Sequence, residues 1–204
     1  MDAMKETVLI KATDMFLALG FKSVTMDDIA AELGISKKTI YQHFANKNDL
    51  VEESSMLLYH RIADGIDVIR AEQHNPIEEF FFIRDFLSQI LKDDSTSSLH
   101  QLQKFFPAIH KTLNEYQFKK TYGCMYDNLE RGIALGYYRE GINIDFISRI
   151  YFAGIVATKD VQVFPESMYK LEGLTLQFLD YHLRSIVTAK GLEVLTKTIA
   201  ENIL

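Results

Sequence analysis

The sequence predicts an all-α fold. Apolar side chains recur at three- and four-residue steps through nearly the whole chain, which is the period of an amphipathic helix. No stretch of useful length alternates between apolar and polar residues, as a half-buried strand would. With 3 Pro and 10 Gly in 204 residues, the chain is poor in the residues that loop-rich β sandwiches and glycine-rich nucleotide folds need. Its length indicates one domain or two small ones.

Capping residues and helix breakers divide the periodic pattern into separate helices. Thr25 and Ser36 can each cap the helix that follows them, and Pro76 is tolerated at a first helical position. Gly20 and Gly34 end the helices that precede them. In chain order, the expected helices cover residues 4–19, 25–33, 36–44, 46–69, 75–91, 99–106, 107–136, 145–163 and 167–187, with a last one after Gly191.

Charge and cysteine content indicate a cytoplasmic protein and leave DNA open as a partner. The net charge is −6, but residues 1–47 hold six Lys and six acidic residues, so the excess acid lies beyond them. A local cluster of lysines is enough to bind phosphate, because salt screens exposed charges beyond about 8–10 Å. Cys124 is the single cysteine and cannot form an internal disulfide. No apolar stretch approaches the roughly 20 residues of a membrane span, and the charged N-terminus is no secretory signal, so we expect no membrane partner.

The segment TMDDIAAELGISKKTIYQHF near the N-terminus has the pattern of a helix-turn-helix. Ile29 and Leu33 lie four residues apart on one face of a short helix, and Gly34 provides a tight turn. Ile40 and Phe44, again four apart, point back toward the same core. Two helices joined by a three- to four-residue turn containing Gly are typical of this motif, whose second helix enters the DNA major groove.

We expect the outward side chains of this motif to bind DNA. Lys37, Lys38 and Thr39 occupy the first turn of the second helix, within reach of phosphates and base edges. Lys47 begins the next helix, where free backbone N–H groups also suit a phosphate. A helical hairpin with a solvated lysine face is the alternative, and the ordered apolar positions favour DNA binding. The predicted DNA-binding residues are Thr25, Ser36, Lys37, Lys38, Thr39, Tyr41, His43 and Lys47.

This N-terminal segment resembles the tetracycline-repressor (TetR) family of bacterial regulators. Signatures of the first helix, the turn and the recognition helix occur in register. One departure is Lys38, because family members often have a small residue just before the Thr. The residues that carry the resemblance are Ala12, Phe16, Gly20, Thr25, Asp28, Ile29, Ala30, Gly34, Ser36, Thr39, Ile40, Tyr41, His43, Phe44, Lys47 and Leu50.

The resemblance implies two domains and a ligand-controlled function. A helix-turn-helix DNA-binding domain would cover residues 1–46, and a larger helical ligand-binding and dimerisation domain would cover residues 47–204. A homodimer would bind a palindromic double-stranded operator and act as a repressor. A small-molecule effector would tilt the long helix that begins at Lys47 and change the separation of the two recognition helices, which must fall about 34–36 Å apart.

Aromatic residues between Phe80 and Tyr126 either fill the core or line an effector cavity. A largely apolar cavity with a few polar anchors is typical of small-molecule sites, and the family resemblance favours one here. Since this segment offers few charges that could offset the desolvation of an ion, we expect an apolar or aromatic effector. The predicted effector-binding residues are Phe86, Phe106, His110, Tyr122 and Tyr126.

Two long helices near the C-terminus are predicted to form the dimer. Gly154 would let another helix approach closely. Residues 167–187 are apolar on more than one face, which suits either a fully buried helix or a helix with a second contact surface. A four-helix bundle between subunits is what the resemblance implies. The predicted interface residues are Ile150, Gly154, Leu174 and Phe178.

The sequence carries no pattern typical of an enzyme. HExxH, GxSxG and Walker motifs are absent, and no Glu is followed three residues later by His. Cys124 has no His near it in sequence and is expected to be buried and unreactive. We therefore expect no catalytic residue, no metal and no cofactor. The alternatives to a DNA-binding regulator are a helical small-molecule-binding or interaction protein with little DNA affinity and, less favoured, a helical-bundle enzyme.

Overall fold

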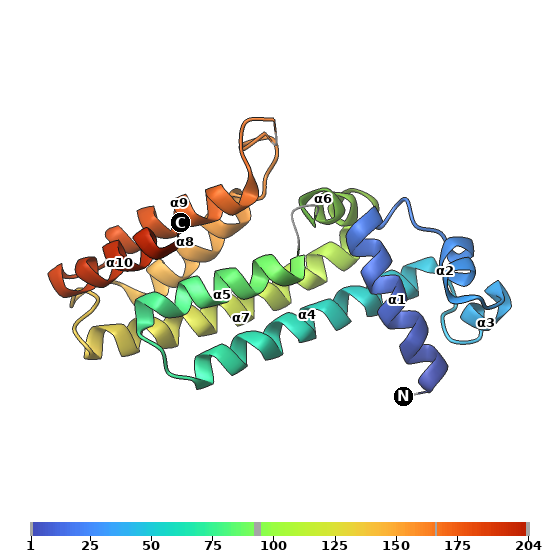
Figure 1. Cartoon of the computed structure of the whole chain (residues 1–204), viewed down its shortest axis with the longest axis horizontal. Coiled ribbons are helices and arrows are strands. Elements are labelled where there is room, and N and C mark those ends of the chain that lie inside the picture. The colour runs from blue at the N-terminus through green and yellow to red at the C-terminus, as the bar shows by residue number, and fades with distance from the viewer. Residues whose placement is uncertain (1, 92–94, 166, 203–204) are drawn as a thin grey trace. The chain divides into compact units, whose positions relative to one another are not determined.

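The computed structural model describes residues 2–91, 95–165 and 167–202 and confirms the all-α prediction (Figure 1). Within those residues no strand forms, and β pairing is limited to one isolated bridge between Tyr138 and Val187. The helices are α1 (Ala3–Leu19), α2 (Met26–Leu33), α3 (Lys37–Tyr41), α4 (Lys47–Ala71), α5 (Pro76–Leu91), α6 (Ser95–Phe105), α7 (Pro107–Ala134), α8 (Ile144–Ala157), α9 (Leu171–Arg184) and α10 (Ala189–Asn202).

The helix boundaries differ from the prediction mainly in four helices. One of them is α6, which begins at Ser95 instead of residue 99. The recognition-helix candidate α3 ends at Tyr41 rather than Phe44, because the His43 N–H bonds to the carbonyl three residues back and tightens the last turn. Near the C-terminus, α8 ends at Ala157 and α9 begins only at Leu171, so both are shorter than predicted. Residues 158–165 form successive turns, in which the N–H of Phe164 bonds to the carbonyl of Asp160.

The chain divides into two compact units. Unit 1 comprises Met1–Ala63 and Leu91–Gln117, and unit 2 comprises Asp64–Ile90 and Phe118–Leu204. Both α4 and α7 therefore begin in unit 1 and continue into unit 2. The functional boundary between residues 46 and 47 stays a prediction.

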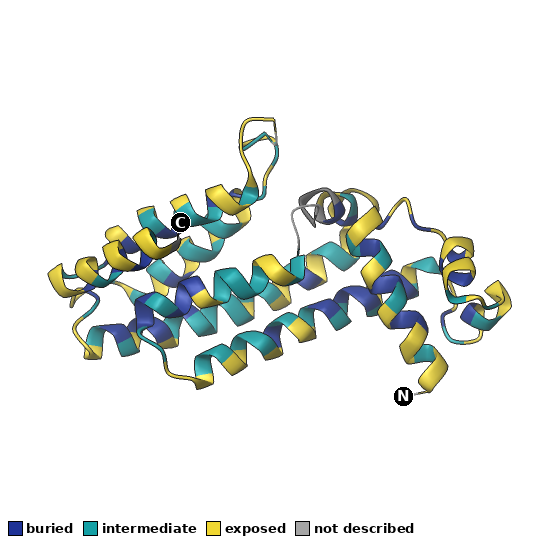
Figure 2. Ribbon diagram, in the orientation of Figure 1, coloured by how far each residue is buried: buried dark blue, intermediate teal, exposed yellow. Residues whose placement is uncertain are grey.

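The core of unit 1 combines the first three helices with α4 and with two later helices. Side chains of α1, α2 and α3 pack with Leu50 and Val51 of α4, and α6 adds Leu102 while α7 adds Leu113. Figure 2 shows these buried positions as dark stripes along the helices of unit 1. The buried residues are Val8, Leu9, Ala12, Phe16, Phe21, Val24, Met26, Ile29, Ala30, Ile40, Phe44, Leu50, Val51, Leu102 and Leu113.

The core of unit 2 is formed by α5, the second half of α7, α9 and α10. Tyr138, just after α7, lies fully buried among them and is the largest side chain of this core. The buried residues are Ile77, Phe80, Phe81, Met125, Leu129, Tyr138, Leu179, Leu183, Ile186 and Leu195. Within the described residues, no helix combines the length and the apolar character that crossing a bilayer requires.

Candidate nucleic-acid interface

Helix α2 begins with a capping box. The Thr25 hydroxyl accepts a hydrogen bond from the Asp28 N–H at 3.2 Å, and the Asp28 carboxylate accepts one from the Thr25 N–H at 2.8 Å. The hydrogen bonds from the Thr25 backbone and hydroxyl hold the pKa of Asp28 below its usual range. The structure therefore gives Thr25 a capping role, and its predicted DNA contact stays a prediction.

A left-handed glycine makes the turn between α2 and α3. Gly34 has φ 64° and ψ 29°, and its N–H bonds to the last carbonyls of α2. A Cβ at this position would meet no atom within 4 Å, so backbone conformation rather than space is what requires glycine here. Ile35 then closes the turn with a hydrogen bond from its N–H to the Ala30 carbonyl at 3.0 Å. This geometry agrees with the predicted helix-turn-helix.

Helix α3 presents one buried and one exposed face. Ile40 and Phe44 are buried in the unit 1 core, as the sequence predicts. At the start of the helix, the Ser36 hydroxyl caps the Thr39 N–H at 3.1 Å and lies 2.8 Å from the Thr39 hydroxyl. The opposite face carries the exposed residues Lys37, Lys38, Tyr41 and Gln42. The first three are predicted DNA-binding residues, and Gln42 is one that sequence analysis did not single out.

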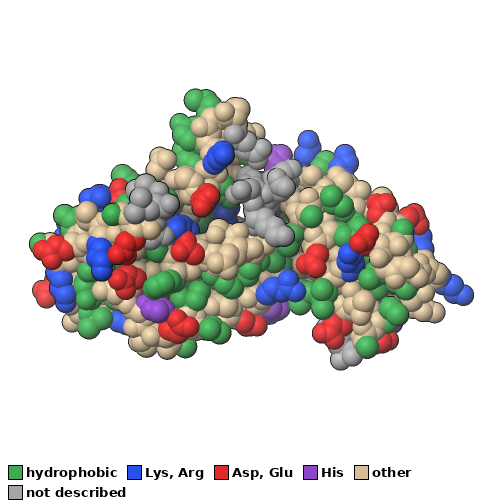
Figure 3. Space-filling model, in the orientation of Figure 1, with side chains coloured by type: hydrophobic (Ala, Val, Ile, Leu, Met, Phe, Trp, Pro, Cys, Tyr) green, Lys and Arg blue, Asp and Glu red, His purple; other side chains and the backbone are tan. Residues whose placement is uncertain are grey.

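The lysines of the predicted interface differ in whether their ammonium groups are paired with a side chain of the same chain. Lys37 forms an exposed ion pair with Asp27 at 2.8 Å, and this hydrogen bond raises the pKa of Lys37. Lys38 is exposed. Cationic and acidic side chains are mixed on the surface over α2 and α3, as Figure 3 shows. A single-sign basic face does not form there, because the acidic residues of α2 lie beside the lysines.

His43 is less exposed than predicted. Its side chain is 16 % exposed, and its Nδ1 lies 3.8 Å from the carboxylate of Asp2, which caps α1. Its DNA contact stays a prediction.

Lys47 occupies a half-buried position instead of the open one that sequence analysis expected. Its Nζ donates a hydrogen bond to the Lys22 carbonyl at 3.0 Å. The same atom lies 5.9 Å from the ring centre of Phe16 and 5.8 Å from that of Phe106. Burial lowers the pKa of Lys47. A phosphate would have to compete with these contacts, so the phosphate role of Lys47 stays a prediction.

Helix α6 joins the N-terminal core, a feature that sequence analysis did not find. The Ser98 hydroxyl donates to the Leu17 carbonyl at 2.9 Å, and the Gln101 side-chain oxygen accepts from the Lys22 N–H at 3.0 Å. Gly20 has φ 92°, and a Cβ there would collide with the Gln101 amide. The end of α1 and the α1–α2 corner are therefore held by a helix some 80 residues later in the chain. The polar run that the sequence shows around α6 gave no signal of this contact.

The five predicted effector-binding residues lie in both units. Phe106 packs against the core of unit 1, and burial lowers the pKa of His110, which lies one helical turn further along α7. In unit 2, the Phe86 ring covers Gly65 of α4 so closely that a Cβ would collide with it. There Tyr122 donates a hydrogen bond to the Asp145 carboxylate at 2.9 Å, and the rings of Tyr122 and Tyr126 are 6.0 Å apart. An effector site formed by these residues stays a prediction.

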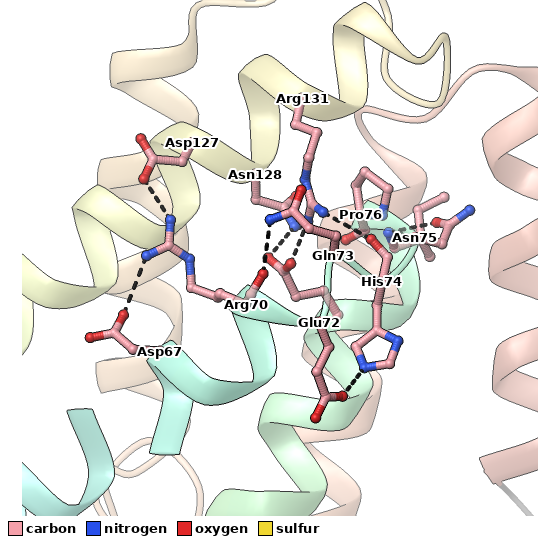
Figure 4. A network of polar contacts seen from close by, with 12 residues as sticks. Asp67, Arg70, Glu72, Gln73, His74, Asn75, Pro76, Asp127, Asn128 and Arg131 are labelled. Atoms are coloured by element: carbon pink, nitrogen blue, oxygen red, sulfur yellow. Dashed lines mark hydrogen bonds and ion pairs between the residues drawn. The ribbon is translucent and has the colours of Figure 1, made fainter. Parts of the chain in front are cut away.

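Unit 2 contains a buried polar network that sequence analysis also missed (Figure 4). Glu79 of α5 is only 3 % exposed and pairs with Arg131 of α7. Asn128 donates to Glu79 at 2.8 Å and to the Pro76 carbonyl at 2.9 Å, and Tyr138 donates to Asn128 at 2.9 Å. Burial raises the pKa of the Tyr138 hydroxyl well above its usual value. The network fastens the α4–α5 loop and the start of α5 to α7.

The predicted dimer residues divide into one exposed and three that contact their own chain. Ile150 is 45 % exposed, whereas Leu174 is only 7 % exposed. Phe178 of α9 lies directly against Gly154 of α8, so the helix that approaches Gly154 closely is in the same chain. The face that stays exposed on α8 has apolar residues at helical spacing, namely Phe146, Ile150, Ala153 and Ala157. Its role in a dimer stays a prediction.

The comparisons with known proteins show what the helix-turn-helix segment resembles. The family described as "Bacterial regulatory proteins, tetR family" has a sequence model that matches residues 8–54, which contain the helix-turn-helix. This part of the chain is therefore similar to the DNA-binding segment of the tetR family. This family is regulatory rather than enzymatic, and within the described residues no group of His, Cys, Asp or Glu could hold a metal ion.

Similarity to known proteins extends beyond residues 8–54. The HTH-type transcriptional repressor KstR2 of Mycolicibacterium smegmatis is 26 % identical over 154 residues, which cover 71 % of this chain and 72 % of the relative. The structure of SmeT, the repressor of a multidrug efflux pump of Stenotrophomonas maltophilia, has a TM-score of 0.70 and 20 % identity, and covers 92 % of both chains. A transcriptional regulator from Cytophaga hutchinsonii has a TM-score of 0.72 and 19 % identity, covering 90 % of this chain and 98 % of the other. At these identities the two structures show a shared fold.

Proposed function

We propose that this protein is a ligand-responsive transcriptional repressor of the tetR family that binds a palindromic operator as a homodimer. The observation that carries the DNA-binding role is the capped α2–turn–α3 arrangement, with Gly34 in the left-handed conformation and exposed polar side chains on α3. Relatives named as repressors, KstR2 among them, support the regulatory role. The protein would act in the cytoplasm, where the operator is.

The exposed apolar face of α8 supports the homodimer. Phe146 is 58 % exposed and Ile150 45 %, and both lie on one stripe with Ala153 and Ala157. Exposed apolar stripes of this kind mark contact surfaces, and small residues let helices approach closely. On α9, Tyr181 is 76 % exposed and adds a large aromatic side chain that a partner subunit would cover. Two-fold symmetry of the protein would then match a palindromic operator.

The effector would act through α4 and α7, because both helices run from unit 1 into unit 2. A ligand shifts the DNA-binding equilibrium only by its difference in affinity between the bound and the free state of the protein. We propose an apolar or aromatic small molecule as the effector. A thermal-shift screen tests this, since a ligand at 100 times its Kd adds about 2.7 kcal/mol to the unfolding free energy.

Selection of genomic DNA fragments by the purified protein tests the DNA-binding role. The protein should enrich a small set of fragments that contain an inverted repeat, and a gel shift should show their binding in the presence of excess unrelated DNA. A protein without measurable sequence preference would contradict the repressor and would support the alternative, a helical small-molecule-binding or interaction protein with little DNA affinity. Matched fragments with a scrambled repeat serve as the control.

A further inference from the structure

The exposed face of α3 holds fewer free polar side chains than its sequence suggests. The Lys37 ammonium is paired with Asp27 at 2.8 Å, and the Ser36 and Thr39 hydroxyls lie 2.8 Å from each other. His43 is half-buried next to the Asp2 carboxylate. Each of these groups already has a partner, which limits the directions in which it can still bind DNA.

Two long polar side chains remain without a partner within the described residues, one on α3 and one on the residue that caps its C-terminal end. Lys38 and Gln42 are both exposed, and within the described part of the chain neither side chain takes part in a hydrogen bond or an ion pair. The Gln42 N–H bonds to the Lys38 carbonyl at 3.1 Å, so the helical geometry extends from one residue to the other. Residues four apart on a helix are neighbours on the same face. This face is opposite to the one that carries the buried Ile40 and Phe44.

The chemistry of these two side chains matches two different bases. A lysine ammonium only donates hydrogen bonds, and guanine presents the acceptors N7 and O6 in the major groove. A glutamine amide both donates and accepts, which suits N7 and the N6 amino group of adenine. Four residues of helix rise by about 6 Å, which corresponds to about two base-pair steps of 3.4 Å.

We propose that Lys38 and Gln42 read the bases of each operator half-site, Lys38 binding a guanine and Gln42 binding an adenine about two base-pair steps away. This inference rests on the proposed DNA-binding function and adds which bases the protein prefers. Lys37 and Lys47, whose ammonium groups are engaged with Asp27 and the Lys22 carbonyl, contribute no base preference.

Selection from a random double-stranded DNA library tests the assignment. The full-length wild-type chain should enrich a half-site with a guanine and an adenine at this spacing. Lys38→Ala should lose the guanine preference alone, and Gln42→Ala the adenine preference alone, each by about 5- to 150-fold. The other positions of the motif should stay unchanged. Because both side chains are exposed, the melting temperatures of the variants should equal that of the wild type.

Three further variants separate base reading from general attraction to DNA. Lys38→Arg should keep the guanine preference, because arginine also donates to N7 and O6. Gln42→Glu should replace adenine by cytosine at its position, because a carboxylate accepts a hydrogen bond from the cytosine N4 amino group. Lys37→Ala is the matched control, and the wild-type motif should persist in it.

The outcomes of the selection distinguish failure of the proposed DNA-binding function from failure of the base assignment alone. A wild-type chain that enriches no motif overturns the proposed function and this inference together. A wild-type motif that persists in Lys38→Ala and Gln42→Ala, with affinity lowered equally for all sequences, overturns this inference alone, because uniform weakening is the sign of a phosphate contact. A motif without guanine and adenine at the stated spacing also overturns it.

Discussion

Cationic side chains near the DNA-binding motif are engaged within the chain to different degrees. Lys37 is held by a carboxylate at the surface, whereas Lys47 is half-buried and bonded to a backbone carbonyl. Exposed ion pairs contribute little to stability and are easily exchanged, so Lys37 can leave Asp27 for a phosphate at small cost. Lys47 would expose the rings of Phe16 and Phe106 if it moved. We therefore expect Lys47 to position the start of α4 as much as to attract DNA.

Removal of the buried carboxylate at position 79 should destabilise the protein strongly. Glu79→Ala leaves Arg131 without its ion-pair partner and Asn128 without one acceptor. Breaking a buried pair by removing one member costs about 3–5 kcal/mol, and we expect the lower end because Arg131 is 22 % exposed. Urea unfolding measures the effect. Glu78→Ala, at the neighbouring half-buried position, is the control and should cost less than about 1 kcal/mol.

His182 should make the stability of the protein depend on pH. Burial lowers its pKa from 6.5 to about 4, and its Nε2 has no hydrogen-bond partner within the described residues. Because the folded state favours the neutral form, its stabilising contribution is complete above pH 6.5 and is lost as the pH falls toward 4. A shift of this size corresponds to about 3 kcal/mol.

The comparison of wild type with His182→Leu isolates this contribution from the carboxylates that also titrate in acid. Unfolding free energies of both proteins should be measured from pH 7.5 to 4. The difference between them should change by about 3 kcal/mol in favour of the variant as the pH falls. Parallel curves for the two proteins would show that His182 does not titrate in this range.

At the scale of elements, short-range signals fix the helix-turn-helix. The Thr25–Asp28 capping box begins α2, Gly34 ends it, and Ser36 caps α3. Each of these caps and the turn glycine acts within three or four residues, which is why the sequence predicts them. The length of α3 is a different matter, because the tight turn at His43 follows from packing of Phe44 into the unit 1 core.

Gly34→Ala should destabilise this element without any steric clash. An L-residue in the left-handed region costs about 1–2 kcal/mol, and no atom lies within 4 Å of the new methyl group. Gly123→Ala is a matched control, since that glycine lies inside α7 with equally open surroundings and no positive φ. Alanine should stabilise α7 by up to about 1 kcal/mol. Thermal unfolding of both variants measures the effect. The melting temperature should fall for Gly34→Ala and rise for Gly123→Ala, and shifts of the same sign would contradict the conformational role of Gly34.

At the scale of the whole molecule, the exposed apolar surface of α8 and α9 accounts for the proposed homodimer. Leu174, which is buried, and Phe178, which lies against Gly154, stabilise the pair of helices within each chain. Phe146, Ile150 and Tyr181 are exposed and free to meet a second copy. Stable interfaces of this kind bury about 1,200–2,000 Å² or more and do not tolerate an unpaired buried charge.

A charge on the exposed stripe of α8 should separate the subunits. Ile150→Glu is expected to give a folded monomer of 23.5 kDa in sedimentation, whereas the wild type should have twice that mass. Operator affinity should fall with it, because one half-site supplies too few contacts. Val68→Glu is the control, since Val68 of α4 is 62 % exposed and lies on neither α8 nor α9. Gly154→Arg is a poor test, because the new side chain would displace Phe178 within the chain.

The amino-acid sequence by itself determined the helical class, the helix-turn-helix and the outward position of Lys37, Lys38 and Tyr41. Periodicity, caps and a turn glycine are local signals, and each acts within a few residues of chain. The tertiary structure decided which of those side chains are free. Lys47 meets a carbonyl 25 residues away, Gln101 holds a backbone N–H 79 residues away, and Arg131 pairs with Glu79 across 52 residues. Such partners depend on how helices pack against one another, and no local pattern encodes that.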